Sequence, residues 1–395
     1  MRSPAPAPGR RVAAPDGHPV AAGVVTAVVG FSSSFVVVLA GLAAVGASAA
    51  EAASGLVALC VAQALGMLWL GLRHRTPLTL AWSTPGAALL VSTGVVEGGW
   101  PAAVGAFVVT ALLIGLTGLV PWLGDLVGRI PASLARAMLA GVLLPLCLAP
   151  VTGLADSPAL VGPVVLTWVL GLLLFPRWAV PASLAVALAV VLVEARSDVD
   201  VDALLPTLAW TTPTWTVPAL VSIALPLYVV TMASQNVPGV AVMASHGYAV
   251  PWRESMTVTG LGTLLAAPFG GHAVNLAAIT AAMAAGPLAG ADRARRWVAS
   301  TSAAVTYLVL AALASALTAV VVAAPGDVVQ AAAGLALVGT LASSLAGALA
   351  EEDGREAAAV CFLVAASGVT VLGVGSAFWA LLAGLALRPL LAARR

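Results

Sequence analysis

The chain has 395 residues, of which 61% are hydrophobic and 8% are charged, and its mean hydropathy is +1.07. Soluble domains carry about 25% charged residues, and no packing of this chain would hide so much apolar surface from water. The composition therefore excludes a soluble globular enzyme and predicts a polytopic membrane protein. A formal net charge of +1 gives no excess of positive charge that would indicate a nucleic-acid partner.

The N-terminal residues and the cysteines suggest no chemistry. Residues 1–19 are rich in proline and predict a disordered cytoplasmic tail. They do not form a signal peptide, because the apolar run that follows is too long for the core of one. Cys60, Cys147 and Cys361 stand alone in apolar runs, so we expect small buried side chains. A disulfide framework, a metal site and a bound cofactor are not expected.

Fourteen apolar segments follow the tail, and a helical span needs about 20 apolar residues. The segments occupy residues 20–46, 53–72, 78–93, 100–120, 134–151, 158–175, 178–194, 216–243, 255–268, 272–286, 295–323, 328–349, 357–373 and 375–391. They predict an all-α membrane protein with a lipid bilayer as its surroundings. The third and tenth segments are too short for ordinary spans.

The arginines orient these segments. If the N-terminus lies inside the cell and the segments alternate in direction, 16 of the 17 basic residues fall in cytoplasmic loops and only Arg196 falls outside. Such an excess of positive charge is typical of cytoplasmic loops. We therefore expect both termini in the cytoplasm and a multi-pass protein in the cytoplasmic membrane of a bacterium.

An even count of fourteen divides into two halves of seven segments. An odd number of spans in each half inverts the second half relative to the first. Inverted repeats are common in secondary transporters, and interrupted helices at matching positions point to their binding sites. Segments three and ten hold matching positions in the two halves, so we predict 7+7 inverted repeats with broken third and tenth segments.

Segment three carries the signals of a helix that begins in mid-membrane. Ser83 and Thr84 are good N-cap residues, and Pro85 suits the first helical position. The predicted helix runs from Pro85 to Thr93 and ends at Gly94. Residues 78–83 would then be extended to reach the middle of the membrane.

Segment ten carries similar signals. Asn275 is a good N-cap residue, the predicted helix runs to Ala285, and Gly286-Pro287 ends it. Residues 272–274 would be extended. Each half-helix would have about ten residues and a length of about 15 Å, which is half the hydrocarbon thickness of about 30 Å.

The two half-helices run in opposite directions, so their N-termini would meet near the middle of the membrane. Each N-terminus offers unpaired N–H groups and the positive end of a helix dipole, which together bind an anion without a buried Lys or Arg. The alternative is two short helices in ordinary re-entrant packing. The substrate-binding residues predicted here are Thr84, Pro85, Gly86, Ala87, Asn275 and Leu276.

Two polar clusters lie at mid-span in the first segment of each half, at residues 32–34 and 234–236. Serines in membrane helices often only bond back to carbonyls or permit close packing. Adjacent amide side chains in lipid are costly unless they are satisfied. We add Ser33, Ser34, Gln235 and Asn236 to the predicted binding residues.

His272 is the only histidine that this arrangement places deep in the apolar region. A histidine at the midplane can carry a proton during transport, so His272 is the predicted proton-coupling and substrate-binding residue. The alternative is a neutral histidine that donates to a carbonyl. No Asp or Glu lies at mid-span, which argues against a carboxylate proton relay and against a carboxylate-dependent membrane enzyme.

Four stretches resemble the benzoate/proton symporter family of the BenE type, and the likeness extends over about residues 20–390. They are AWSTPGAALL (81–90), RIPASLARAMLAGVLL (129–144), SQNVPGVAVM (234–243) and PFGGHAVNLAAITAAM (268–283). The family is similar in plan to the uracil and xanthine permeases and to the sulfate-type anion transporters. The likeness implies a core domain from residues 20–120 and 216–323 and a gate domain from residues 121–195 and 328–391. Related folds dimerise through their gate domains, so a homodimer is a further hypothesis.

The resemblance implies a secondary transporter, not an enzyme, that imports benzoate or a similar aromatic carboxylate with protons by alternating access. Uracil permease-like proteins carry carboxylates on segments eight and ten. This chain has the amides Gln235 and Asn236 and the stretch 272–275 there, which suits an anion better than a neutral base. A carrier for another organic anion or a nucleobase, and an anion channel, remain as alternatives.

Overall fold

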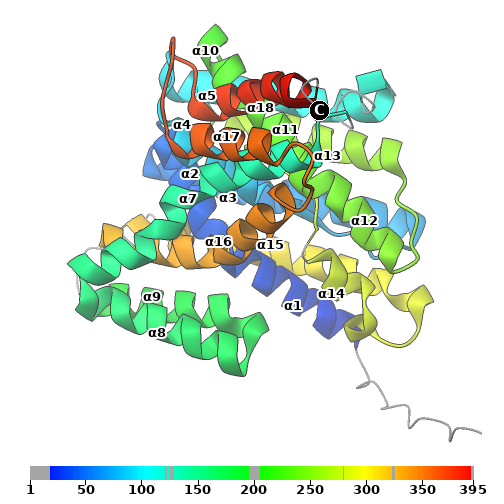
Figure 1. Ribbon diagram of the computed structural model, residues 1–395. Helices are drawn as coiled ribbons and strands as arrows, with labels where there is room; N and C mark the ends of the chain where they lie inside the picture. The colour runs from blue at the N-terminus through cyan, green and yellow to red at the C-terminus, as the bar shows by residue number, and fades with distance from the viewer. Residues whose placement is uncertain are drawn as a thin grey trace, which may run out of the picture.

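The computed structural model describes residues 18–120, 122–123, 129–194, 205–278, 280–322 and 325–392, and its architecture is almost entirely helical (Figure 1). Residues 1–17 of the tail predicted for residues 1–19, and the loop that holds Arg196, lie outside the described residues. The predicted end of the tail is slightly too late, because the first helix begins at Pro19. Seven helical runs among the described residues are long and apolar enough to cross a membrane. They are Pro19–Ala44, Ala49–His74, Gly99–Leu119, Ala132–Asp156, Val217–Ser245, Arg293–Val322 and Gly326–Ala348.

The elements of the first half match the first seven predicted segments. They are α1 (Pro19–Ser32), α2 (Phe35–Ala44), α3 (Ala49–His74), β1 (Leu80–Trp82), α4 (Thr84–Thr93), α5 (Gly99–Leu119), α7 (Ala132–Asp156), α8 (Pro158–Leu174), the short 3₁₀ turn η1 (Pro176–Trp178) and α9 (Ala179–Glu194). The third segment is interrupted, as predicted, by an extended stretch before α4.

The second half repeats this order. Its elements are α10 (Val217–Ala219), η3 (Leu220–Ala224), α11 (Leu225–Thr231), η4 (Met232–Asn236), α12 (Val237–Ser245), α13 (Trp252–Ala266), η5 (Ala267–Phe269), β2 (Val274–Leu276), α14 (Ala281–Ala285), η6 (Pro287–Ala289), η7 (Arg293–Arg295), α15 (Trp297–Val322), α16 (Gly326–Ala348), α17 (Arg355–Ala366) and α18 (Ser376–Ala392). The predicted plan of two seven-segment halves, with interrupted third and tenth segments, is confirmed.

The first segment of each half is irregular at its polar cluster, which local sequence signals did not predict. In the first half, α1 and α2 are separated by a turn at Ser33 and Ser34. The hydroxyls of both serines donate to the carbonyl of Gly30, at 3.0 and 3.2 Å. Such bonds compete with the helical ladder and bend it. In the second half the matching cluster lies in η4, a π-helical turn.

The two extended stretches pair with each other in the middle of the fold. Strands β1 and β2 are antiparallel, with Ala81 opposite Asn275. The pairing continues beyond the strands, because Ser83 N donates to Ala273 O at 3.0 Å and Ala277 N donates to Thr79 O at 2.9 Å. Water is absent from the membrane interior, so an extended segment there needs partners for its backbone groups. Each strand supplies the partners of the other.

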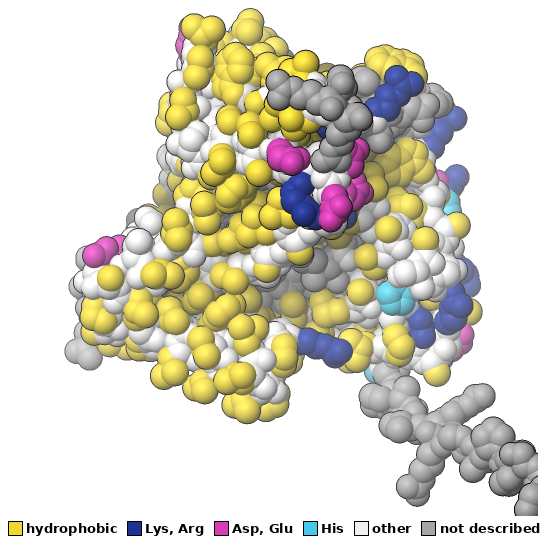
Figure 2. Space-filling model, in the orientation of Figure 1, with side chains coloured by type: hydrophobic (Ala, Val, Ile, Leu, Met, Phe, Trp, Pro, Cys, Tyr) yellow, Lys and Arg dark blue, Asp and Glu magenta, His cyan; other side chains and the backbone are white. Residues whose placement is uncertain are grey.

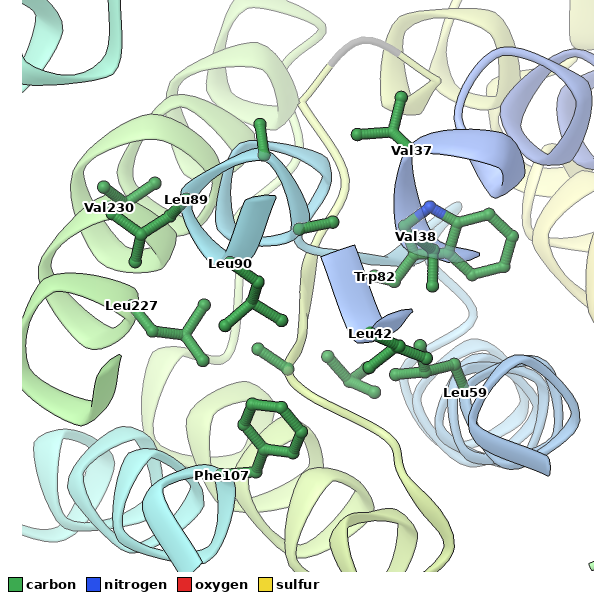
Figure 3. Close-up of a cluster of buried hydrophobic side chains, with 14 of the residues drawn as sticks. Val37, Val38, Leu42, Leu59, Trp82, Leu89, Leu90, Phe107, Leu227 and Val230 are labelled. Atoms are coloured by element: carbon green, nitrogen blue, oxygen red, sulfur yellow. The ribbon is translucent and has the colours of Figure 1, made fainter. Parts of the chain in front are cut away.

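Helix α4 is packed on several sides by apolar side chains. Figure 3 shows Leu89 and Leu90 of α4 beside Leu227 and Val230 of α11, and all four are buried. On another side the backbones of α2 and α4 touch, since a β-carbon on Gly41 would lie 2.5 Å from the carbonyl oxygen of Ala87. The close approach fixes where α4 lies.

The helices pack in two groups. One group contains α1, α3, α5, α13 and α15, in which α3 packs on α15 and α5 packs on α13. The other contains α7, α8, α9, α16, α17 and α18, in which α7 packs on α16 and α17. Figure 1 shows α8 and α9 side by side at the lower left, away from α5 and α13.

The visible surface suits a lipid environment. Figure 2 shows hydrophobic side chains over most of this face, with arginines gathered mainly toward its right side. On α8 and just after it, Leu173 is 74% exposed and Phe175 is 67% exposed. Such a surface needs hydrocarbon around it.

The contact between α2 and α4 gives the first prediction. Gly41→Val should lower the thermal unfolding temperature of the detergent-solubilised protein, because overpacking at a backbone contact costs about 1–3 kcal/mol. Gly339→Val is the matched control, since nothing lies within 4 Å of its β-carbon position and it lies inside α16. Equal losses in the two variants would contradict the close contact.

Candidate functional site

The start of α4 matches the prediction to within one residue, because the helix begins at Thr84 and Pro85 is its second residue. Ser83 is the N-cap residue: its Oγ accepts from Gly86 N at 3.1 Å, and its carbonyl accepts from Ala87 N at 2.8 Å. Pro85 has no N–H group, so the Thr84 N–H is the amide of the first turn that Ser83 does not satisfy. Thr84 is half-buried. The helix ends at Thr93, as predicted, and Gly94 follows with a positive φ of 68°.

The start predicted for segment ten is wrong. Asn275 does not cap a helix; it lies in β2, where its backbone pairs with Ala81. Its side-chain Nδ2 donates to the carbonyl of Leu276 at 2.8 Å. Helix α14 begins only at Ala281, after the N-cap residue Thr280, and has five residues instead of about ten. Pairing with β1 keeps the chain extended beyond the expected boundary at residue 274.

The amides of β2 and its flank are already bonded. Leu276 N donates to Asn236 Oδ1 at 2.8 Å, and Val274 N donates to Thr263 Oγ1 at 2.9 Å. Ala277 N is held by the Thr79 carbonyl, as described above. In this conformation Leu276 and Asn275 therefore do not present free N–H groups to an anion. At the other half-helix, the Thr84 N–H makes no hydrogen bond to a residue that the structure describes.

Ser83 joins the two halves of the chain. Its hydroxyl accepts from Thr231 Oγ1 at 2.8 Å, and its carbonyl lies 2.9 Å from His272 Nε2. A carbonyl can only accept, so Nε2 carries the proton. His272 is fully buried, and its Nδ1 has no partner among the described residues. This is the geometry of a neutral histidine that donates to a carbonyl, which is the alternative to a proton carrier.

The π-helical turn η4 gives its two amide side chains different surroundings. Asn236 is buried and holds the Leu276 N–H. Gln235 is half-buried and makes no hydrogen bond to a described residue. π-Helical turns occur often at functional sites. Asn236 therefore positions β2, and Gln235 keeps its amide available.

The serines of the first segment also differ. Ser34 is buried, and its Oγ accepts from Trp82 Nε1 at 2.9 Å, which ties the turn between α1 and α2 to β1. Ser33 is half-buried and bonds back to its own segment. The indole of Trp82 also packs edge-on against Phe31, with ring centroids 5.6 Å apart.

Sequence reasoning missed several residues that build this region. Thr231 and Thr263 hold Ser83 and Val274, and Thr280 occupies the N-cap position of α14 without a side-chain capping bond. Each is a threonine in an otherwise apolar stretch, a signal that is present but does not distinguish them from the many other threonines of the spans. Trp82 directly precedes the N-cap residue, which in hindsight is the more specific signal.

A large apolar groove lies elsewhere. It has a volume of about 650 Å³ and runs between α3 and α13 on the outer face, where Leu65 and Leu261 are more than half exposed. Its one carboxylate, Glu254, is already bonded by Trp69 and His74. A groove with apolar walls open to lipid does not provide a carboxylate site.

Electrostatics at the half-helices come from the backbone. Among the described residues, the one buried charged side chain is Arg296, which is 8% exposed. It donates to the carbonyls of Ala285 and Gly290, at 2.6 and 2.9 Å, and so stabilises the C-terminal end of α14. Positive potential at the start of α4 therefore depends on N–H groups and the helix dipole.

Two inverted halves, each with an interrupted third segment that meets its counterpart in the middle of the fold, are a plan that membrane transporters often use. The family model described as "Benzoate membrane transport protein" matches residues 15–390. The chain therefore belongs to the BenE family of membrane transporters.

Two relatives agree with this assignment. The chain is 41% identical over 366 residues to "Inner membrane protein YdcO" of Escherichia coli, covering 92% of this chain and 93% of that protein. It is 29% identical over 329 residues to the "Benzoate membrane transport protein" of Acinetobacter baylyi, covering 83% of each.

In fold, the chain is similar to the transmembrane domain of the cyanobacterial bicarbonate transporter BicA, with a TM-score of 0.59 at 15% identity over 93% of this chain and 96% of that one. It is also similar to the murine anion transporter Slc26a9 in the inward-facing state, with a TM-score of 0.63 at 12% identity over 94% of this chain and 68% of that one.

The cap at Ser83 gives the second prediction. Ser83→Ala should destabilise the protein by about 0.5–2 kcal/mol, because Gly86 N loses its acceptor and Thr231 loses its partner. Ser92→Ala is the control: its hydroxyl only bonds back to the Leu89 carbonyl of the same helix. Thermal unfolding of both variants measures the difference, and an unchanged Ser83→Ala variant would refute the structural role of the cap.

Proposed function

We propose that this transporter imports benzoate or a similar aromatic carboxylate together with protons, by alternating access and without enzymatic chemistry. The observation that carries the proposal is the start of α4, a capped helix N-terminus inside the bundle with the Thr84 N–H left unsatisfied by its cap. A relative named for benzoate transport supports the choice of substrate.

The start of α4 is suited to a carboxylate. The unsatisfied Thr84 N–H and the half-buried Thr84 side chain lie at the positive end of the helix dipole, which favours an anion. Gln235 would orient the ligand with its unbonded amide. Pro85, Gly86 and Ala87 would shape the turn, and Gly86 packs so closely on Leu227 that a β-carbon would lie 2.3 Å from Cδ1. Apolar surroundings of this kind suit a phenyl ring.

Alternating access would be a movement between the two packing groups. The core domain would comprise residues 20–120 and 216–323, and the gate domain residues 121–195 and 328–391. The closer packing within each group of helices than between them supports this division. We place both termini in the cytoplasm, from the distribution of arginines, and retain a homodimer through the gate helices as a hypothesis.

His272 is our proposed proton carrier. Its Nε2 already donates to Ser83, so an incoming proton would bind Nδ1, the nitrogen without a partner. A charge there would be unpaired in this buried position and therefore costly. We infer that protonation accompanies an opening of the site in which Nδ1 gains water or the substrate carboxylate as a partner.

The deciding experiment is uptake of labelled benzoate into proteoliposomes with imposed pH and potential gradients. We expect accumulation driven by an inward proton gradient and counterflow by unlabelled benzoate. Uptake of a different acid or of a nucleobase, with no competition by benzoate, would show that benzoate is not the substrate. Currents far above the turnover of a carrier would favour an anion channel instead.

The proton assignment has its own test. His272→Gln retains an amide donor for the Ser83 carbonyl but cannot carry a proton. We expect benzoate counterflow to persist while accumulation driven by a pH gradient is lost. Accumulation that still follows the pH gradient in this variant would exclude His272 as the carrier, whereas loss of both activities would indicate a positioning role alone.

A further inference from the structure

Tyr307, in the unbroken helix α15, points its side chain toward the candidate site. Its ring packs edge-on against Trp82, the residue before the cap of α4, with ring centroids 6.0 Å apart. Its side chain is 3% exposed. Nothing in the sequence of this helix distinguishes it as part of a binding site, and the function proposed above makes no use of it.

The hydroxyl of Tyr307 lies between the two irregular segments that border the site. A β-carbon on Gly30 would lie 2.6 Å from this hydroxyl oxygen and 3.2 Å from the methyl carbon of Thr280. Gly30 is the residue whose carbonyl accepts from Ser33 and Ser34 at the turn between α1 and α2. Thr280 is the half-buried N-cap residue of α14.

This hydroxyl has no hydrogen-bond partner among the described residues. Polar groups inside a protein that lack a protein partner usually bind water or a ligand. Tyr228, the other buried tyrosine of the bundle, behaves differently, because its hydroxyl bonds to the hydroxyl of Thr117. The missing partner of Tyr307 is therefore a local feature of the site and not a general property of tyrosines in this fold.

We propose that Tyr307 is a further substrate-binding residue, whose hydroxyl donates a hydrogen bond to the carboxylate of the transported acid. The proposal rests on the function proposed above. The carboxylate would accept from the Thr84 N–H at the start of α4 and from Tyr307 at the start of α14. The absence of a side chain at Gly30 lets this hydroxyl lie close to the turn between α1 and α2.

The experiment measures equilibrium binding of benzoate to the purified full-length protein. Tyr307→Phe removes only the hydroxyl and should weaken binding about tenfold or more, since hydrogen bonds to charged groups contribute more than those to neutral ones. Tyr228→Phe is the matched control: it removes a buried hydroxyl at similar burial, 4% exposed, and should leave benzoate affinity unchanged.

A second variant protects the test against misfolding. Gly30→Ala keeps the hydroxyl but places a methyl group against it, and should also weaken benzoate binding while thermal unfolding confirms a folded protein. If the wild type binds benzoate and Tyr307→Phe binds it equally well, the hydroxyl holds only water and the assignment is overturned, with the proposed function intact. If the wild type fails to bind benzoate, both proposals fall.

Discussion

The pairing of β1 with β2 is the constraint on which the rest of the structure depends. An extended chain inside a membrane exposes backbone groups that no water can satisfy. Each half of this chain contains one such stretch, and neither is tolerable alone. Opposed at Ala81 and Asn275, they satisfy each other and hold the two halves together at the point where α4 begins.

The candidate site follows from that junction. Ser83 terminates the paired stretch and caps α4, and two residues of the second half, Thr231 and His272, bond to it. Asn236 in turn holds the amide of Leu276. The start of a helix from the first half is thereby positioned by side chains of the second. Any movement that separates the halves at this junction would alter the proposed anion site directly, and a carrier requires such coupling between movement and binding.

The sequence predicted the features of the fold that depend on interactions between neighbouring residues. Ser83, Pro85 and Gly94 mark α4 because capping and termination depend on neighbouring residues. The same reasoning failed at Asn275, because the competing interaction is a strand almost two hundred residues away, which no local pattern reveals. The turn at Ser33 and Ser34 and the role of Tyr307 were missed for similar reasons. A serine cluster in a membrane helix is typical of ordinary packing. A tyrosine in a continuous apolar helix gives no indication, from the sequence alone, of the residues that its side chain contacts.

The most direct test of the central claim is an experimentally determined structure of the protein with bound benzoate. The account predicts the carboxylate against the Thr84 N–H at the start of α4 and the ring among the apolar side chains around Leu227. Benzoate bound elsewhere, such as in the groove between α3 and α13, with the start of α4 unoccupied, would contradict it.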